Sequence, residues 1–76
     1  MAFDPNLDVT LDSRELAFNN TRITVSIKQY NEGEKKIQIG REVWRNEDWS
    51  FAKLGRMTQE EAKGVSEALQ ELVAKM

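Results

Sequence analysis

Hydrophobic and polar residues alternate most clearly in the middle of the chain. Ile23, Val25 and Ile27 occupy every second position, and polar residues stand between them. β-Branched residues at a spacing of two are typical of a strand that buries one face. Residues 31–34 then predict a hairpin turn, in which Gly33 would adopt a positive φ at little cost.

A return strand is predicted from Lys35 or Lys36 to about Arg45. Its polar residues and Trp44 share one parity, and its apolar residues share the other: Ile37, Ile39 and Val43. Gly40 interrupts the strand, and a glycine inside a strand often marks a bulge. A bulge here would exchange the two faces after it, so the face on which Trp44 lies depends on Gly40.

The next segment predicts a second turn at residues 46–48 and a further strand that reaches Met57. In this strand Trp49 and Phe51 alternate with small residues. Aromatic residues in the strands of a small protein can serve as core or as exposed binding groups, and the pattern alone leaves both possibilities open.

A C-terminal helix is predicted from Gln59 to Lys75. Thr58 and Glu61 have the spacing of a capping box, and apolar residues recur at steps of three and four after it. The apolar stripe could cover the sheet, pair with a partner helix, or do both. Its candidate contacts in a dimer are Val65, Leu69, Leu72 and Met76.

The N-terminal segment carries a weaker signal. Its first six residues read as a loose terminus, and Leu7, Val9 and Leu11 then alternate with polar residues. We therefore divide the chain into residues 1–15, an arm or an edge strand, and a domain of residues 16–76. The predicted fold is α+β: a curved antiparallel sheet of about four strands, followed by one C-terminal helix.

Composition limits the chemistry that this chain can perform. A chain of 76 residues forms one small domain, and it contains neither histidine nor cysteine. Disulfides and thiolate or imidazole metal sites are thereby excluded, and a nucleophile would lack its usual base. We expect a non-catalytic protein without cofactors, with self-association as its route to stability. The chain has no membrane-length apolar run and no signal-peptide pattern, which favours an intracellular protein, cytoplasmic and nucleoid-associated or, in a eukaryote, nuclear.

Charge is unevenly distributed, although the net charge is −2. Residues 22–56 hold eight Lys or Arg against five Asp or Glu. Cations beside flat rings are the two ingredients of single-strand nucleic-acid binding. Strand parity gathers four such residues on one candidate face: Lys28, Tyr30, Lys36 and Trp44.

Several short motifs resemble a known family. These are VSIKQY at residues 25–30, IQIG at 37–40, REVW at 41–44 and KLGRMTQEE at 53–61. In this order and spacing they resemble the core of the transcriptional coactivator called positive cofactor four. The resemblance runs from about Leu16 to Met76.

The resemblance implies a homodimer that binds single-stranded DNA with little sequence preference and dimerises through helices and sheet ends. It implies a role in transcription regulation or in replication and repair. The turn at 31–34 carries two acids where the family is basic, and residues 49–51 replace a more polar loop, so RNA stays open as the ligand. A protein-interaction module with buried aromatic residues is the alternative. The binding positions that the resemblance implies are Tyr30, Lys35 or Lys36, Arg41, Trp44, Lys53 and Arg56.

Overall fold

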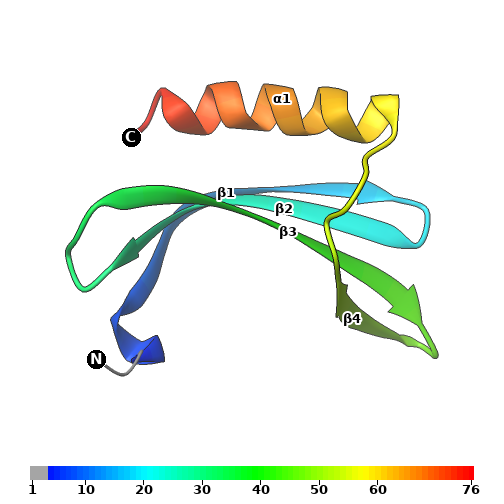
Figure 1. Cartoon of the computed structure of the whole chain (residues 1–76), viewed down its shortest axis with the longest axis horizontal. Helices are drawn as coiled ribbons and strands as arrows, with labels where there is room; N and C mark the ends of the chain where they lie inside the picture. The colour runs from blue at the N-terminus through cyan, green and yellow to red at the C-terminus, as the bar shows by residue number, and fades with distance from the viewer. Residues whose placement is uncertain (1–3) are drawn as a thin grey trace.

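One α-helix lies across one face of a four-stranded antiparallel sheet (Figure 1). The computed structural model describes residues 4–76, and the strand order is β1-β2-β3-β4. This arrangement confirms the predicted α+β class. The elements are the 3₁₀ helix η1 (Pro5–Leu7), β1 (Asp8–Phe18), β2 (Thr21–Tyr30), β3 (Lys35–Arg45), β4 (Asp48–Ala52) and α1 (Gln59–Val73).

The hydrophobic core lies between β2 and α1. β2 is paired on both sides, so the alternate apolar residues that face the helix are almost completely covered. Burial of each large aliphatic side chain contributes about 1.5–3 kcal/mol. The buried core consists of Ile23, Val25, Ile27, Val65, Ala68 and Leu72.

The sheet arches under α1, and its ends bend away from the helix (Figure 1). The face opposite the helix is therefore concave, and we call it the concave face. Cross-strand partners share a face, so the register assigns its members on the three later strands. They are Arg22, Thr24, Ser26, Lys28 and Tyr30 of β2, Lys36, Gln38, Gly40, Glu42 and Trp44 of β3, and Trp49 and Phe51 of β4.

The strands depart from the sequence predictions in β1 and β4 and agree with them at Gly40. β1 is one continuous edge strand, which crosses the proposed division at residue 15, and its register shifts between Thr10 and Asp12. No register shift occurs at Gly40, so Trp44 stays on the same face as Lys36. β4 ends at Ala52 rather than at Met57, because residues 53–58 leave the sheet to reach α1.

The first hairpin turn uses residues other than the predicted glycine. Asn31 and Glu32 have positive φ values of 48° and 58°, whereas Gly33 does not. Gly33 is needed for space instead, since a Cβ there would lie 3.0 Å from the carbonyl oxygen of Tyr30. Positive φ at two successive positions suits the twist of a hairpin.

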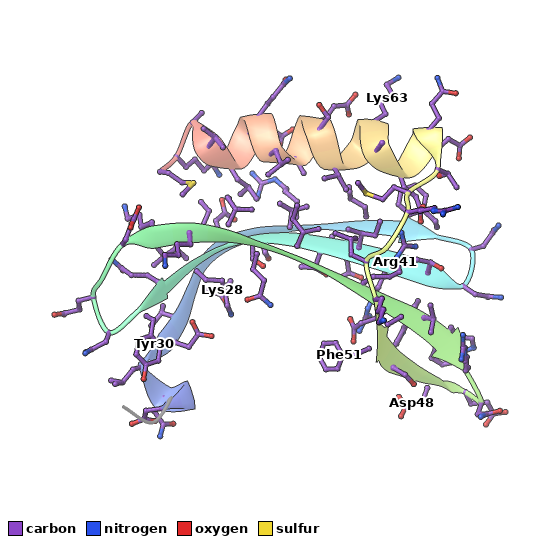
Figure 2. All side chains as sticks on the ribbon, in the orientation of Figure 1. Lys28, Tyr30, Arg41, Asp48, Phe51 and Lys63 are labelled. Atoms are coloured by element: carbon purple, nitrogen blue, oxygen red, sulfur yellow. The ribbon has the colours of Figure 1, made fainter. Side chains whose placement is uncertain are left out.

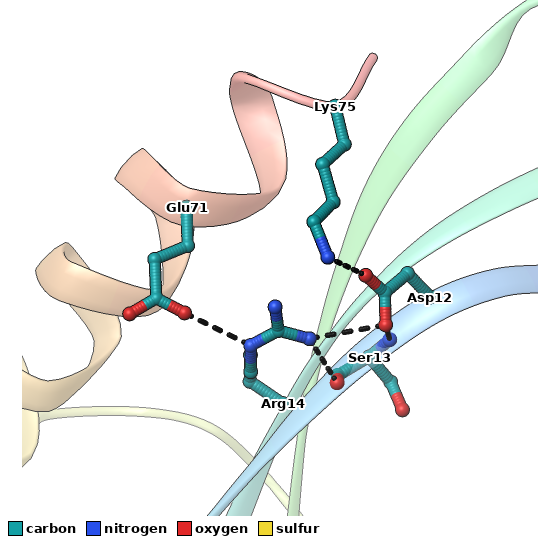
Figure 3. Close-up of polar contacts among 5 residues, drawn as sticks. All are labelled: Asp12, Ser13, Arg14, Glu71 and Lys75. Atoms are coloured by element: carbon teal, nitrogen blue, oxygen red, sulfur yellow. Dashed lines mark hydrogen bonds and ion pairs between the residues drawn. The ribbon is translucent and has the colours of Figure 1, made fainter.

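A polar cluster joins the C-terminal part of α1 to β1 (Figure 3). Arg14 Nε donates to Glu71 at 2.9 Å, and Lys75 Nζ donates to Asp12 at 2.7 Å. The Lys75 contact, together with the backbone N–H of Ser13, lowers the pKa of Asp12 from 3.8 to about 2. These contacts fix the direction in which α1 crosses the sheet. The helix itself ends at Val73, two residues before the predicted end.

Candidate nucleic-acid interface

One end of the concave face is hollow and carries two lysines, and we call it the lysine end. Lys28 and Lys36 lie directly opposite each other on β2 and β3, and Tyr30 lies two residues beyond Lys28. All three line a hollow of about 680 Å³, together with Asp8, Glu34 and residues 37–39 of β3. Figure 2 shows Lys28 projecting from the sheet away from α1, with Tyr30 at the same end. The structure thus brings together three of the four residues that parity placed on one face.

The N-terminal segment contacts the lysine end. Asp8 lies 3.7 Å from Lys28 Nζ, which donates a hydrogen bond of 2.6 Å to Thr10. The backbone N–H of Asp4 donates to the Tyr30 hydroxyl at 2.8 Å. η1 therefore lies against this end of the sheet, and residues 1–3 of the predicted arm lie outside the described residues. Acidic and polar groups occupy part of the surface that a phosphate would need.

The other end of the concave face is aromatic. Trp44 and Trp49 are opposite each other in the register, and their rings meet edge to face at a centroid distance of 5.4 Å. The Arg22 guanidinium lies 4.3 Å from the centroid of Trp49. It also donates to Glu42 at 2.7 Å, which raises the pKa of Arg22. Phe51 completes this end and keeps 91% of its surface exposed.

Between the two ends, Gly40 leaves the concave face without a side chain. A Cβ built at this position would meet no atom within 4 Å, and its φ lies outside the left-handed region. Neither packing nor backbone conformation therefore requires a glycine here. A ligand could approach the strand backbone closely at this point.

Arg41 does not belong to this surface, contrary to what the resemblance implies. It faces α1, and Figure 2 shows it beside the chain that leads to the helix. Its guanidinium donates to Glu61 at 2.8 Å and to the carbonyl oxygens of Leu54 and Arg56 at 3.1 and 3.2 Å. These contacts fasten the connection between β4 and α1 to the sheet, which gives Arg41 a structural role.

The remaining predicted cations lie off the concave face. Lys35 begins β3 with the parity of the helix-facing residues, and it is exposed. Lys53 and Arg56 are exposed in the connection between β4 and α1. Sequence reasoning missed three members of the aromatic end: Trp49, Phe51 and Arg22. A two-residue turn at 46–47 would have placed Trp49 and Phe51 opposite β3 residues whose face was already predicted.

The helix residues predicted as dimer contacts fall into two groups. Val65 and Leu72 are 4% and 0% exposed, because they pack on the sheet of the same chain. Leu69 is half-buried, and Met76 is 44% exposed. The sheet-cover interpretation therefore holds for the first pair, and only the second pair is available to a partner.

Comparisons of this chain with protein-family models, with curated proteins and with solved structures found no match. Among residues 4–76, no helix is long and apolar enough to cross a membrane. The same residues contain no group of three or more acidic side chains arranged to hold a metal ion. The functional argument therefore rests on the geometry of the concave face.

Proposed function

We propose that this protein binds single-stranded nucleic acid, without catalysis, on the concave face of its sheet. The observation that carries the proposal is the shared face of Lys28, Lys36, Tyr30 and Trp44. Lysines would neutralise phosphates, while the rings stack bases, a contact worth about 1–3 kcal/mol per base. Trp44 is 42% exposed and its ring is available on the surface.

The proposal includes weak discrimination between sequences. The cations and rings on this face offer no paired donor and acceptor set of the kind that reads base edges. Every base has a face that can stack, so a surface of this kind tolerates any sequence. Roles in transcription regulation or in replication and repair follow from the resemblance to positive cofactor four and are part of the proposal.

The direct test is a fluorescence titration with DNA and RNA oligonucleotides about 20 nucleotides long, in low salt. We expect quenching of tryptophan emission, since Trp44 lies on the binding face. Lys36→Ala should weaken binding severalfold, and Trp44→Ala by about tenfold. Lys63→Ala is the matched control, because it removes the same charge from α1 on the opposite side of the molecule (Figure 2). Absence of binding at ~50 mM salt would exclude the proposal.

A homodimer is the second part of the proposal, supported by incompletely covered apolar surface on the helix side. α1 packs against β1 and β2, and Ile37 and Ile39 of β3 stay half-buried beside it. Val73 and Met76 are 57% and 44% exposed. A second copy that covers this surface would add to the core of a small domain. Light scattering should give twice the chain mass, and Val73→Glu should shift it toward the monomer.

The same apolar surface favours the competing function, a protein-interaction module. In that case a different protein would cover Ile37, Ile39 and Val73, and the concave face would have no ligand. The oligonucleotide titration distinguishes the two functions, because only the nucleic-acid-binding function predicts binding. Val73→Glu leaves the concave face untouched, so oligonucleotide binding by the folded variant points to the sheet rather than to the helix.

A further inference from the structure

We propose that Phe51 and the bare backbone at Gly40 form a base-stacking subsite, separate from the Tyr30 end of the concave face. Its ligand would be an unpaired nucleobase of the bound strand. This inference rests on the proposed function and adds two residues to the binding face that neither parity nor family resemblance assigned.

The exposure of Phe51 is the first observation. It lies on a strand, with 91% of its surface exposed, and Figure 2 shows its ring projecting from β4 into the space on the concave side. Trp44, on the same face, is 42% exposed. Two large exposed rings at diagonal positions on one sheet face are the kind of apolar surface that marks a binding site.

The register places Gly40 next to this ring. Phe51 pairs with Glu42, and Gly40 lies two residues before Glu42 on the same face. Diagonal neighbours across antiparallel strands are about 7–8 Å apart, which is within reach of an aromatic side chain. A base stacked on Phe51 would therefore extend over the one position of this region that carries no side chain. That overlap gives the glycine at position 40 a purpose that the fold does not.

The charges around the ring permit a nucleic-acid strand. Glu42, the cross-strand partner of Phe51, accepts a hydrogen bond of 2.7 Å from Arg22. Arg22 also lies 3.7 Å from Glu15. The cation thus offsets the nearest carboxylate, while its guanidinium holds Trp49 in place from one side. Arg22 is shared between two carboxylates, so the aromatic end offers rings rather than free cations and suits bases. Lys36, which makes no ion pair within residues 4–76, is the cation available to a phosphate.

Substitutions at Phe51 test the stacking itself. With a labelled oligo-dT about 20 nucleotides long, Phe51→Ala should weaken binding by about tenfold, the loss expected for one stacked base. Phe51→Leu should lose as much, because leucine is apolar but has no π face, and Phe51→Tyr should bind within about twofold of wild type. Val9→Ala, at an exposed apolar position of β1 off the concave face, is the control and should bind like wild type.

Gly40→Val tests the close approach. Its side chain would enter open space, and valine suits a strand better than glycine, so the thermal midpoint should be unchanged or higher. Binding should nevertheless fall by at least severalfold. A variant that is more stable and binds less well is difficult to explain except by occlusion of a ligand.

The outcomes separate this inference from the proposed function. If wild type binds and Phe51→Ala or Phe51→Leu binds equally well, the subsite is wrong and the proposed function stands. If wild type binds no oligonucleotide, both are wrong. If Phe51→Ala changes the oligomeric mass measured by light scattering but leaves the affinity unchanged, the subsite is wrong and the ring belongs to a contact between copies of the chain.

Discussion

Arg41→Ala is predicted to destabilise this protein rather than to weaken binding at the surface. The Arg41 and Glu61 side chains are only 11% and 9% exposed, and they are joined at 2.8 Å. Loss of one partner from a buried ion pair costs about 3–5 kcal/mol, because the other charge stays behind unpaired. Since this pair lies beside an exposed connection, we expect the lower end, about 3 kcal/mol.

This cost is large against the stability of the whole domain. A chain of this length is typically stable by about 4–11 kcal/mol. Glu61 also accepts from the backbone N–H of Thr58 at 2.9 Å as part of the capping box that begins α1. Arg41 supports this box and the connection before it, so its loss should loosen the attachment of α1 to the sheet.

Urea unfolding monitored by far-UV circular dichroism gives the measurement. Arg41→Lys should lower the free energy of unfolding by less than Arg41→Ala, because lysine keeps the positive charge. It should still lower it, because lysine cannot bind the carboxylate and two carbonyl oxygens together. The double variant Arg41→Met with Glu61→Leu should recover most of the loss, since neither charge remains buried. The reasoning is refuted if Arg41→Ala costs under about 1 kcal/mol while oligonucleotide affinity falls tenfold. Arg41 would then act at the surface, as the resemblance implies.

Three further predictions follow from single contacts. Asp8→Asn should tighten oligonucleotide binding by up to about fivefold in anisotropy titrations, because it frees Lys28 from an exposed ion pair; Glu67→Gln, which makes the same change of charge on α1, should not. Glu47→Gly should raise the thermal midpoint by a few degrees, about 0.5 kcal/mol, because Glu47 has a φ of 64° in a hairpin turn. Stability should be full above about pH 5 and fall as the pH drops from 4.5 toward 2, because Arg41 lowers the pKa of Glu61 and Lys75 lowers that of Asp12 to about 2. In urea titrations over this range, Asp12→Asn should lose less stability between pH 3.8 and 2 than wild type.

The pattern of hydrophobic and polar residues predicted those elements in which apolar residues recur at one constant spacing. β2 and β3 begin and end close to the predicted residues, and the capping box at Thr58 begins α1 as expected. Periodicity depends only on which face is buried, and these segments each bury one face. β4 was predicted too long, because Leu54 continues its alternation although the chain has already turned toward α1.

Arg41 shares the parity of Ile37 and Ile39, and the structure places it on the helix-facing side, although the resemblance implied a binding position for it. Ile37, Ile39 and Arg41 are alternate residues of one strand, so a core-facing strand places all three under the helix. A resemblance between sequences assigns a role to a position, but it does not show whether another side chain of the same protein forms an ion pair with that residue. Glu61 is that partner, and it lies twenty residues away along the chain. Sequence separation hides such pairs until the fold is known.

The charges of the concave face indicate what should hold a strand there. Lys28 is paired with Asp8 and Arg22 with Glu42, while Lys36 makes no ion pair within residues 4–76. A strand would thus meet one or two available cations, and each phosphate neutralised on a single strand contributes about −0.7 to the slope of log affinity against log salt. We therefore expect a slope between about −0.7 and −1.4, shallower than a basic surface would give. Most of the binding energy must then come from stacking, so loss of a ring should cost more than loss of a lysine at every salt concentration.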